Sequence, residues 1–113
     1  MKCKTKRQIK TCLLKRYDTC CYCGVSLNIT NATIENIIPH SLGGRWVDIA
    51  CFICNQRYNN IYTCWTHFEC TGKEKYLYKT YELLMCVIHQ RQRVRNPILD
   101  LYPAICFLIG VSE

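Results

Sequence analysis

Apolar residues recur at helical spacing near each end of the chain. Ile9, Leu13 and Leu14 lie among lysines, so residues 3–17 are predicted to form a basic amphipathic helix. A second pattern, with steps of three and four residues, runs through residues 73–96 and predicts a longer amphipathic helix that Pro97 stops. The apolar face of this second helix would carry Leu77, Tyr81, Leu84, Met85 and Ile88.

The stretch between the two helical patterns is turn-rich and contains several cysteines. The β-branched sequence "ATIENII" from Ala32 predicts a strand, and Val25 to Leu27 could pair with it as a hairpin through an Asn-rich turn. Residues 54–62 predict a short helix, and a linking segment then ends at Gly72. The apolar run at 104–111 predicts a buried strand or a terminal helix, since a membrane span needs about 20 residues.

These elements predict a small α+β protein of one domain, residues 1–113, with no membrane contact. Its expected parts are a basic N-terminal helix (1–17), a cysteine-rich core (18–60), an amphipathic helix (73–96) and an apolar C-terminal segment (97–113) that offers a surface for a protein partner. A core of this size gains from a metal staple.

The positive charge of the chain suggests nucleic acid as a partner. The chain has 15 Lys and Arg against 8 Asp and Glu, and the cations cluster at both ends. Clustered cations release counterions from phosphates, which favours nucleic-acid contact, although a solvated, solubility-promoting surface would look the same. The candidate contacts are Lys4, Lys6, Arg7, Lys10, Arg45, Arg91, Arg93 and Arg95.

The 11 cysteines are the strongest chemical signal. Cys20-x-x-Cys23-Gly24 and Cys51-x-x-Cys54 can deliver four thiolates tetrahedrally, as a structural Zn²⁺ requires. The basic N-terminus lacks the apolar run of a signal peptide, so an intracellular reducing compartment is expected and disulfides are the weaker alternative.

Other cysteines and histidines form a looser set. Cys64, His67, Cys70, Cys86 and His89 could build a second metal site, but a buried thiol and a capped histidine are more common on an apolar helix. Cys3, Cys12 and Cys106 are expected to be core thiols.

The order of the pieces "CCYCG", "ATIEN", "IIPHSLGG" and "CFICNQRYNN" resembles the zinc-bearing branch of the HNH (ββα-metal, His-Me finger) endonucleases, over about residues 17–60. The resemblance implies a zinc-stapled ββα-metal core flanked by the two predicted helices. It also implies that Glu35 and Asn55 hold a catalytic Mg²⁺ or Mn²⁺ against the scissile phosphate, for which oxygen ligands are suited.

The sequence departs from that family at the catalytic base. Asn36 occupies the position of the family's histidine, and a carboxamide has no useful basicity. Loss of a general base typically costs a factor of about 10² to 10⁴, so weak or absent cleavage is expected. His40 could substitute, but it lies past Pro39 where the family carries a residue that faces the nucleic-acid backbone.

The segment from Gly44 to Cys51 is also shorter than is usual in the family, and the family's bracing asparagine is either missing or replaced by Asp48. Arg57 and Tyr58 fall where a phosphate-contacting lysine often lies. The sequence therefore supports two hypotheses of function. The first is an HNH-type DNA endonuclease with cleavage impaired at Asn36. The second is a non-catalytic zinc-stapled module that binds DNA or structured RNA, such as a ribosome-associated subunit.

Overall fold

The computed structural model describes residues 5–90 and 93–113, so the predicted contacts Lys4 and Arg91 and the predicted core thiol Cys3 lie outside the described residues. The chain divides into two compact units. The first unit is Met1–Gln56 with Arg91–Val94, and the second unit is Arg57–Gln90 with Arg95–Glu113. The prediction of a single domain is not tested by this division, and each unit is described by itself below.

The first unit begins with helix α1, Lys6–Arg16, within the predicted range 3–17. A capping box starts the helix: the Gln8 backbone N–H donates to Thr5 Oγ1 at 3.2 Å, and the Thr5 N–H donates to Gln8 Oε1 at 2.8 Å. Helix α1 packs against the two strands of the unit. The predicted basic N-terminal helix is therefore confirmed.

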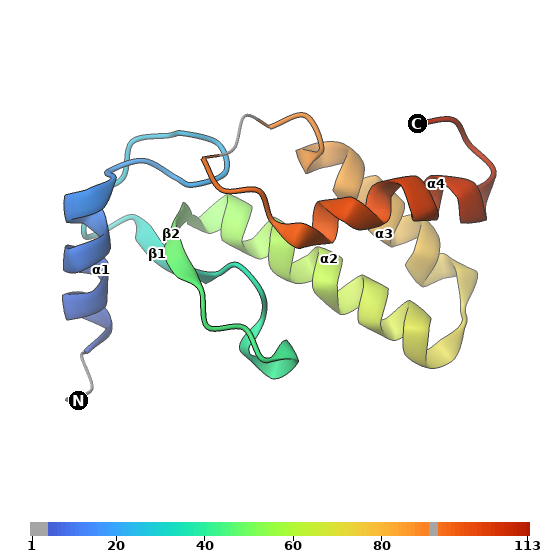
Figure 1. Ribbon diagram of the computed structural model, residues 1–113, viewed down its shortest axis with the longest axis horizontal. Helices are drawn as coiled ribbons and strands as arrows, with labels where there is room; N and C mark the ends of the chain where they lie inside the picture. The colour runs from blue at the N-terminus through green and yellow to red at the C-terminus, as the bar shows by residue number, and fades with distance from the viewer. Residues whose placement is uncertain (1–4, 91–92) are drawn as a thin grey trace. The chain divides into compact units, whose positions relative to one another are not determined.

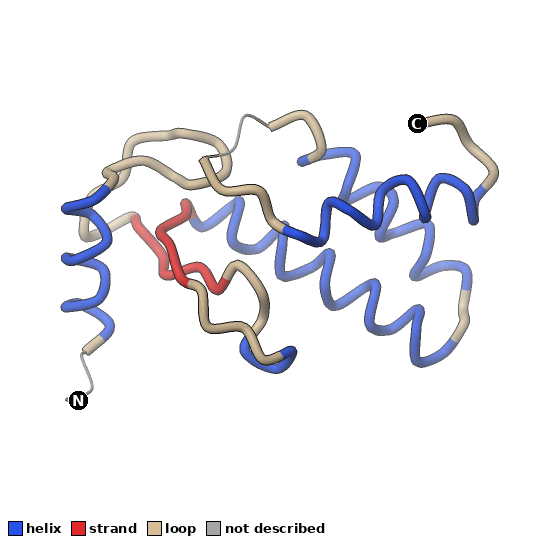
Figure 2. Tube along the Cα trace, viewed as in Figure 1, coloured by secondary structure: helices blue, strands red, loops and turns tan. Residues whose placement is uncertain are grey.

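The sheet of the first unit is an antiparallel pair, β1 (Ala32–Asn36) and β2 (Val47–Cys51), drawn in red in Figure 2. A loop with a short 3₁₀ helix, η1 (His40–Leu42), connects them. The Gly-Gly sequence in the loop has a steric cause. Gly43 has φ +83°, a left-handed conformation that favours glycine, and a Cβ on Gly44 would collide with the carbonyl oxygen of Ile38.

The strand at "ATIEN" is confirmed, but its predicted partner is wrong. Val25 to Leu27 do not pair with β1. Ser26 instead forms an isolated bridge with Thr19, and the Leu27 N–H donates to Asp18 O at 2.7 Å. The first C-x-x-C turn folds this segment back onto its own entering chain, which leaves β1 free to pair with the strand that leads to the second C-x-x-C.

Helix α2 covers Phe52–Thr71 and is much longer than the predicted 54–62 (Figure 1). The predicted linking segment before Gly72 is therefore wrong. Residues 63–71 contain neither Gly nor Pro, so nothing interrupts the helix before Gly72. Gly72 then ends it with φ +68°, and its N–H donates to Phe68 O at 2.7 Å.

The second unit is helical beyond α2, with α3 (Glu74–Val87), the 3₁₀ helix η2 (Pro97–Leu101) and α4 (Tyr102–Ile109). Helix α3 ends at Val87, nine residues before the predicted boundary at 96. The predicted apolar face is only half right: Leu77 and Leu84 are buried, whereas Met85 is 48% exposed. The core of the unit contains Tyr58, Ile61, Leu77, Leu84, Val87, Ile98, Leu99, Ile105 and Cys106.

A buried polar residue joins elements within the second unit. Asn96, fully buried, caps η2 by accepting a hydrogen bond from the Ile98 N–H at 3.0 Å. The same Oδ1 accepts a hydrogen bond from the Tyr62 hydroxyl of α2 at 2.7 Å. Asn96 thereby fixes the entry of the C-terminal segment against α2.

The C-terminal apolar run forms a terminal helix, one of the two predicted forms. Ile105 and Cys106 of α4 are buried, while Phe107 is 85% exposed and Leu108 is 55% exposed. The expected protein partner for this segment stays a prediction. Among the described residues, no helix combines the length and the apolar character needed to cross a bilayer.

Candidate metal centre and nucleic-acid interface

The four cysteines of the two C-x-x-C pairs meet in the first unit. The sulfurs of Cys20, Cys23, Cys51 and Cys54 all lie within 4.8 Å of one another, and Cys23 Sγ is 3.8 Å from Cys51 Sγ. A tetrahedral Zn²⁺ with Zn–S bonds of about 2.3 Å places its sulfurs about 3.8 Å apart. The donor set and its spacing fit a structural zinc ion.

The local backbone explains how each pair curls around the site. Within the first pair, Gly24 adopts φ +79° and its N–H donates to Cys20 O at 3.0 Å, which closes the turn. The Tyr22 N–H donates to Cys20 Sγ at 3.4 Å, and the Cys54 N–H donates to Cys51 Sγ at 3.4 Å. Backbone N–H groups aimed at sulfur stabilise thiolate over thiol.

The cysteines of the cluster shift the pKa values of one another. Hydrogen bonds from Cys21 and Cys54 lower the pKa of Cys20, while the hydrogen bond to Cys20 and burial raise the pKa of Cys54. Four thiolates at this spacing need a metal ion, and Zn²⁺ binding displaces the remaining protons.

Cys21, between the two ligands of the first pair, is fully buried. A hydrogen bond to Cys20 raises the pKa of its thiol, with a further contribution from burial. Cys21 is therefore a protonated neighbour of the cluster. This agrees with the spacing, which selects Cys20 as the ligand.

One face of the strand pair carries the predicted catalytic-metal ligands. Glu35 is 6% exposed, and its buried Oε2 has no hydrogen-bond partner among the described residues. Burial raises the pKa of Glu35 to about 7, a hydrogen bond from Tyr22 opposes this rise, and the charge of Cys20 adds to it. A buried carboxylate oxygen without a partner is a position that a cation would satisfy.

Asn55 reaches the same face from the first turn of α2. Its Nδ2 donates to Thr33 Oγ1 at 2.9 Å and to Ile34 O at 3.2 Å. Alternate residues of a strand share a face, so Thr33 and Glu35 lie on one side of β1. The fold thereby brings an amide and a carboxylate, both hard donors, to one side of the strand.

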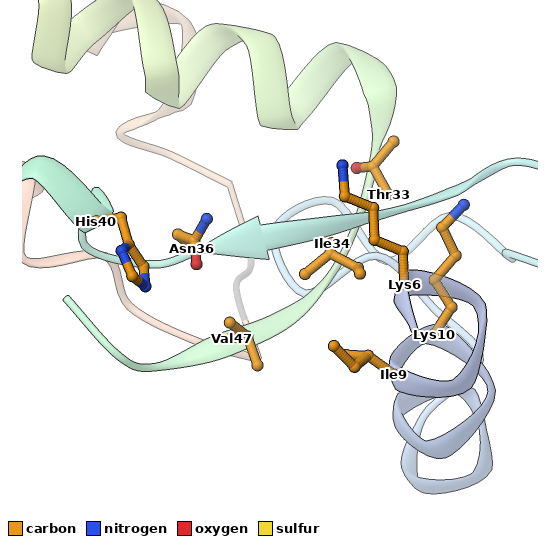
Figure 3. Close-up of a pocket in the computed structure, with 8 residues that line it drawn as sticks. All are labelled: Lys6, Ile9, Lys10, Thr33, Ile34, Asn36, His40 and Val47. Carbon is orange, nitrogen blue, oxygen red and sulfur yellow. The ribbon is translucent and has the colours of Figure 1, made fainter. Parts of the chain in front are cut away.

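A cavity of about 590 Å³ lies between α1 and the strand pair. Asn36 and His40 line one end of it and Lys6 and Lys10 line the other, as Figure 3 shows. The side chains between the two ends are Ile9, Ile34 and Val47, and Thr33 completes the lining. Asn36 and His40, separate in the sequence, thus face one cavity.

Part of the chain matches the model of a known protein family. Residues 20–63 match the family model described as HNH endonuclease. These residues, less than half of the chain, are therefore similar to HNH endonucleases, and we call them the HNH segment. It contains the four cysteines, both strands and the first part of α2. The chain has no match among curated proteins or among solved structures.

Helix α1 and Arg93 lie outside the HNH segment, yet both complete it. Arg93 Nη2 lies 2.9 Å from Asp48 Oδ1, and Arg93 Nη1 donates to Thr19 O at 3.1 Å and to Thr19 Oγ1 at 3.0 Å. The guanidinium also lies over the Tyr17 ring, 4.0 Å from its centroid. Arg93, predicted from charge as a nucleic-acid contact, is thus held as a brace within the unit.

Asp48 is the residue that the sequence offers as a replacement for the bracing asparagine of the family. It is paired with Glu35 across the strands, and its carboxylate accepts the Ile49 N–H at 2.7 Å. Sequence reasoning missed its ion pair with Arg93. A charged residue within the strand that leads to the second C-x-x-C was the available signal, since a part-buried charge needs a partner.

The remaining predicted contacts divide by environment. Arg7, Arg45 and Arg57 are exposed, whereas Arg95 Nη2 is 2.8 Å from Asp100 Oδ1 in an exposed ion pair. Tyr58 is 1% exposed and belongs to the core, so its suggested place at a phosphate is wrong.

The loose second set of cysteines and histidines does not converge. Among the described residues, only the four zinc cysteines of the HNH segment form a group of three or more potential metal ligands. The ring of His67 packs edge-on against Tyr76, with centroids 5.0 Å apart. Cys86 and Cys12 are exposed, so the expectation of buried thiols is wrong for both, whereas Cys106 is buried as predicted.

Proposed function

We propose that this protein is an HNH-type nucleic-acid-binding protein whose metal-dependent cleavage is impaired by Asn36. One observation carries the proposal. Asn36, at the end of β1 in the position of the family's base, lines the cavity with His40 and two lysines. The carboxamide can orient a water molecule by hydrogen bonding, but it cannot take the proton that a nucleophilic water must lose.

Glu35 and Asn55 are the residues that would hold the divalent ion, through the unpartnered carboxylate oxygen and the side-chain amide. When bound, Mg²⁺ or Mn²⁺ would neutralise developing charge on the phosphate. The chain's own contribution is placement. Asn55 is held against β1 by its two hydrogen bonds, and Glu35 is desolvated on the same side of the strand.

A paired cleavage assay tests the proposal. Wild-type protein and Asn36→His are incubated with supercoiled plasmid and either Mg²⁺ or Mn²⁺. The histidine restores a group with a pKa near neutrality, so the nicking rate is expected to rise by a factor of about 10² to 10⁴. Glu35→Gln, introduced into Asn36→His, should remove the gain, because the neutral amide binds the ion less well.

His40 is the control for residual activity. It lines the same cavity as Asn36, so any wild-type nicking should disappear in His40→Ala if His40 acts as the base. If neither wild type nor Asn36→His nicks plasmid, single-stranded DNA or structured RNA, the nuclease proposal is wrong.

The second candidate is the non-catalytic module that binds DNA or structured RNA. The loss of basicity at Asn36 combined with two lysines on the same cavity favours it. Phosphate contacts would dominate, so affinity should fall steeply with salt concentration. An affinity that does not change with salt contradicts this candidate. Either candidate requires reduced cysteines, which supports the expectation of a reducing compartment.

A further inference from the structure

The cavity beside Asn36 is built partly from outside the HNH segment. Lys6, Ile9 and Lys10 come from α1, whereas the HNH match begins at residue 20. Helix α1 therefore adds one wall to the strand pair. This wall consists of two lysines and one isoleucine.

The α1 wall supplies positive charge at one end. Lys6 and Lys10 are one helical turn apart, and Figure 3 shows both at the end of the cavity away from His40. No Asp or Glu is among the residues found to line the cavity. Neither lysine forms an ion pair within residues 5–90 and 93–113. Both charges are thus available to an anion.

The middle of the cavity is apolar. Ile9 from α1, Ile34 from β1 and Val47 from β2 lie between the two polar ends. A duplex that presents only its phosphate backbone gains nothing from an aliphatic floor, whereas the face of an unstacked base does. The volume of about 590 Å³ falls within the range of about 300–1,000 Å³ that is usual for small-ligand sites.

We propose that this cavity takes one unpaired nucleotide of a nucleic-acid strand, with its phosphate at Lys6 and Lys10 and its base on Ile9, Ile34 and Val47. The proposal rests on the proposed function, since it specifies which part of a nucleic acid the HNH protein holds. It adds a role for α1, which the family match does not cover.

The far end of the cavity fits the same occupant. The side-chain amide of Asn36 offers one acceptor and a pair of N–H donors, the groups with which asparagine pairs to a base edge. His40 offers a ring that can stack on a base. A histidine at position 36 would offer only a single neutral donor and a single acceptor in a fixed ring.

Fluorescence anisotropy with matched duplexes tests the proposal. The probes have equal length, and one contains a single unpaired nucleotide at its centre. The protein keeps its zinc, and Mg²⁺ and Mn²⁺ are omitted so that no probe is cut. Wild type is expected to bind the duplex with the unpaired nucleotide about fivefold more tightly, which corresponds to burying about 40 Å² of apolar surface of one base.

Variants assign the preference to the cavity. Ile9→Gln makes the floor polar without a change of charge and should abolish the preference. Lys6→Gln and Lys10→Gln should weaken binding to the unpaired probe more than to the paired one. Lys15→Gln is the matched control, because Lys15 is exposed on the same helix and does not line the cavity, so it should weaken both equally.

A direct measurement covers the case in which Ile9→Gln disturbs folding. In wild type, methyl NMR signals of Ile9, Ile34 and Val47 should shift on titration with thymidine 5′-monophosphate, while those of Ile105 in the second unit should not. Equal affinity for the two duplexes, or unshifted cavity methyls, overturns the inference and leaves the proposed function intact. Failure to bind any nucleic acid overturns both.

Discussion

The two units of the chain are stabilised by different chemistry. The first unit has a two-stranded sheet and no buried residue in α1, and its small apolar core is joined by three buried cysteines, Cys20, Cys21 and Cys54. The second unit has helices around aliphatic side chains such as Leu84 and Ile105, both fully buried. A two-stranded hairpin is marginal in water, whereas packed helices are not. We therefore expect the first unit to depend on a metal ion at its four cysteines, and the second unit not to.

The chain carries a reporter for each unit. Its two tryptophans are Trp46, in the loop before β2, and Trp65, in the part of α2 that belongs to the second unit. Trp46→Phe and Trp65→Phe each leave a single tryptophan, which can be excited selectively over the tyrosines. Unfolding of the two units can then be followed separately within the full chain.

The largest expected effect is loss of the metal. Cys54→Ser removes a buried ligand, and structural zinc typically contributes about 10–16 kcal/mol at neutral pH, more than a small unit can lose. The fluorescence of Trp46 should report unfolding, and the zinc count should fall from about one ion per chain to near zero. The fluorescence of Trp65 should change little.

Cys86→Ser is the matched control, because Cys86 is an exposed thiol on α3 outside the cluster. It should retain the zinc and leave both tryptophan signals unchanged. Equal unfolding of both units in Cys54→Ser would show that the second unit depends on the metal as much as the first.

The zinc cysteines were predictable because they depend on local spacing. Two C-x-x-C pairs specify four ligands regardless of how the surrounding chain folds. The strand at Ala32 was likewise predictable, since β-branching acts within a few residues. The confirmed features are those set by near neighbours.

Contacts between distant segments were not predictable in the same way. The strand partner of β1 depended on where the zinc turn sends the chain, and the brace from Arg93 to Thr19 joins residues 74 positions apart. The end of α2 was misplaced because residues 63–71 have low helix propensity but no breaker. Tertiary packing decided each of these features.

The next largest effect is expected in the second unit. Leu84→Ala leaves a cavity at a fully buried site and should lower the free energy of unfolding by about 2–5 kcal/mol. Urea denaturation followed at Trp65 measures it. The same substitution should leave the Trp46 transition and the zinc content unchanged. A coupled shift of both transitions would show that the units unfold as one.

The brace of the first unit comes next. Arg93→Ala removes the ion pair with Asp48 and both hydrogen bonds to Thr19, and should cost on the order of 2–3 kcal/mol, because the carboxylate loses its partner at a part-buried site. The zinc should remain bound. Urea denaturation followed at Trp46 gives the value.

Arg95→Ala is the control for this substitution. Its ion pair with Asp100 is at a similar distance but both side chains are well exposed, so it should cost less than about 1 kcal/mol. If the two arginine variants lose equal stability, burial is not what distinguishes the brace of the first unit.

The smallest effect concerns the buried carboxyl of the first unit, and it has the opposite sign. Because burial raises the pKa of Glu35 to about 7 in the folded state, folding favours the protonated form. The stability from this group is full below the ordinary pKa of about 4.5 and is lost as pH rises through 7. Glu35→Gln, which stays neutral, should therefore be more stable than wild type at pH 8, by on the order of 1–3 kcal/mol, and nearly equal at pH 5.

Binding of a divalent ion gives a second test of the role of Glu35. If Glu35 and Asn55 hold Mn²⁺, the ion should raise the Trp46 melting temperature of wild type at pH 8 and not that of Glu35→Gln. Asp100→Asn, an exposed carboxyl of the second unit, should respond to Mn²⁺ as wild type does. A gain from Mn²⁺ that survives Glu35→Gln would place the ion elsewhere. The first unit would then depend on metal only through its four cysteines.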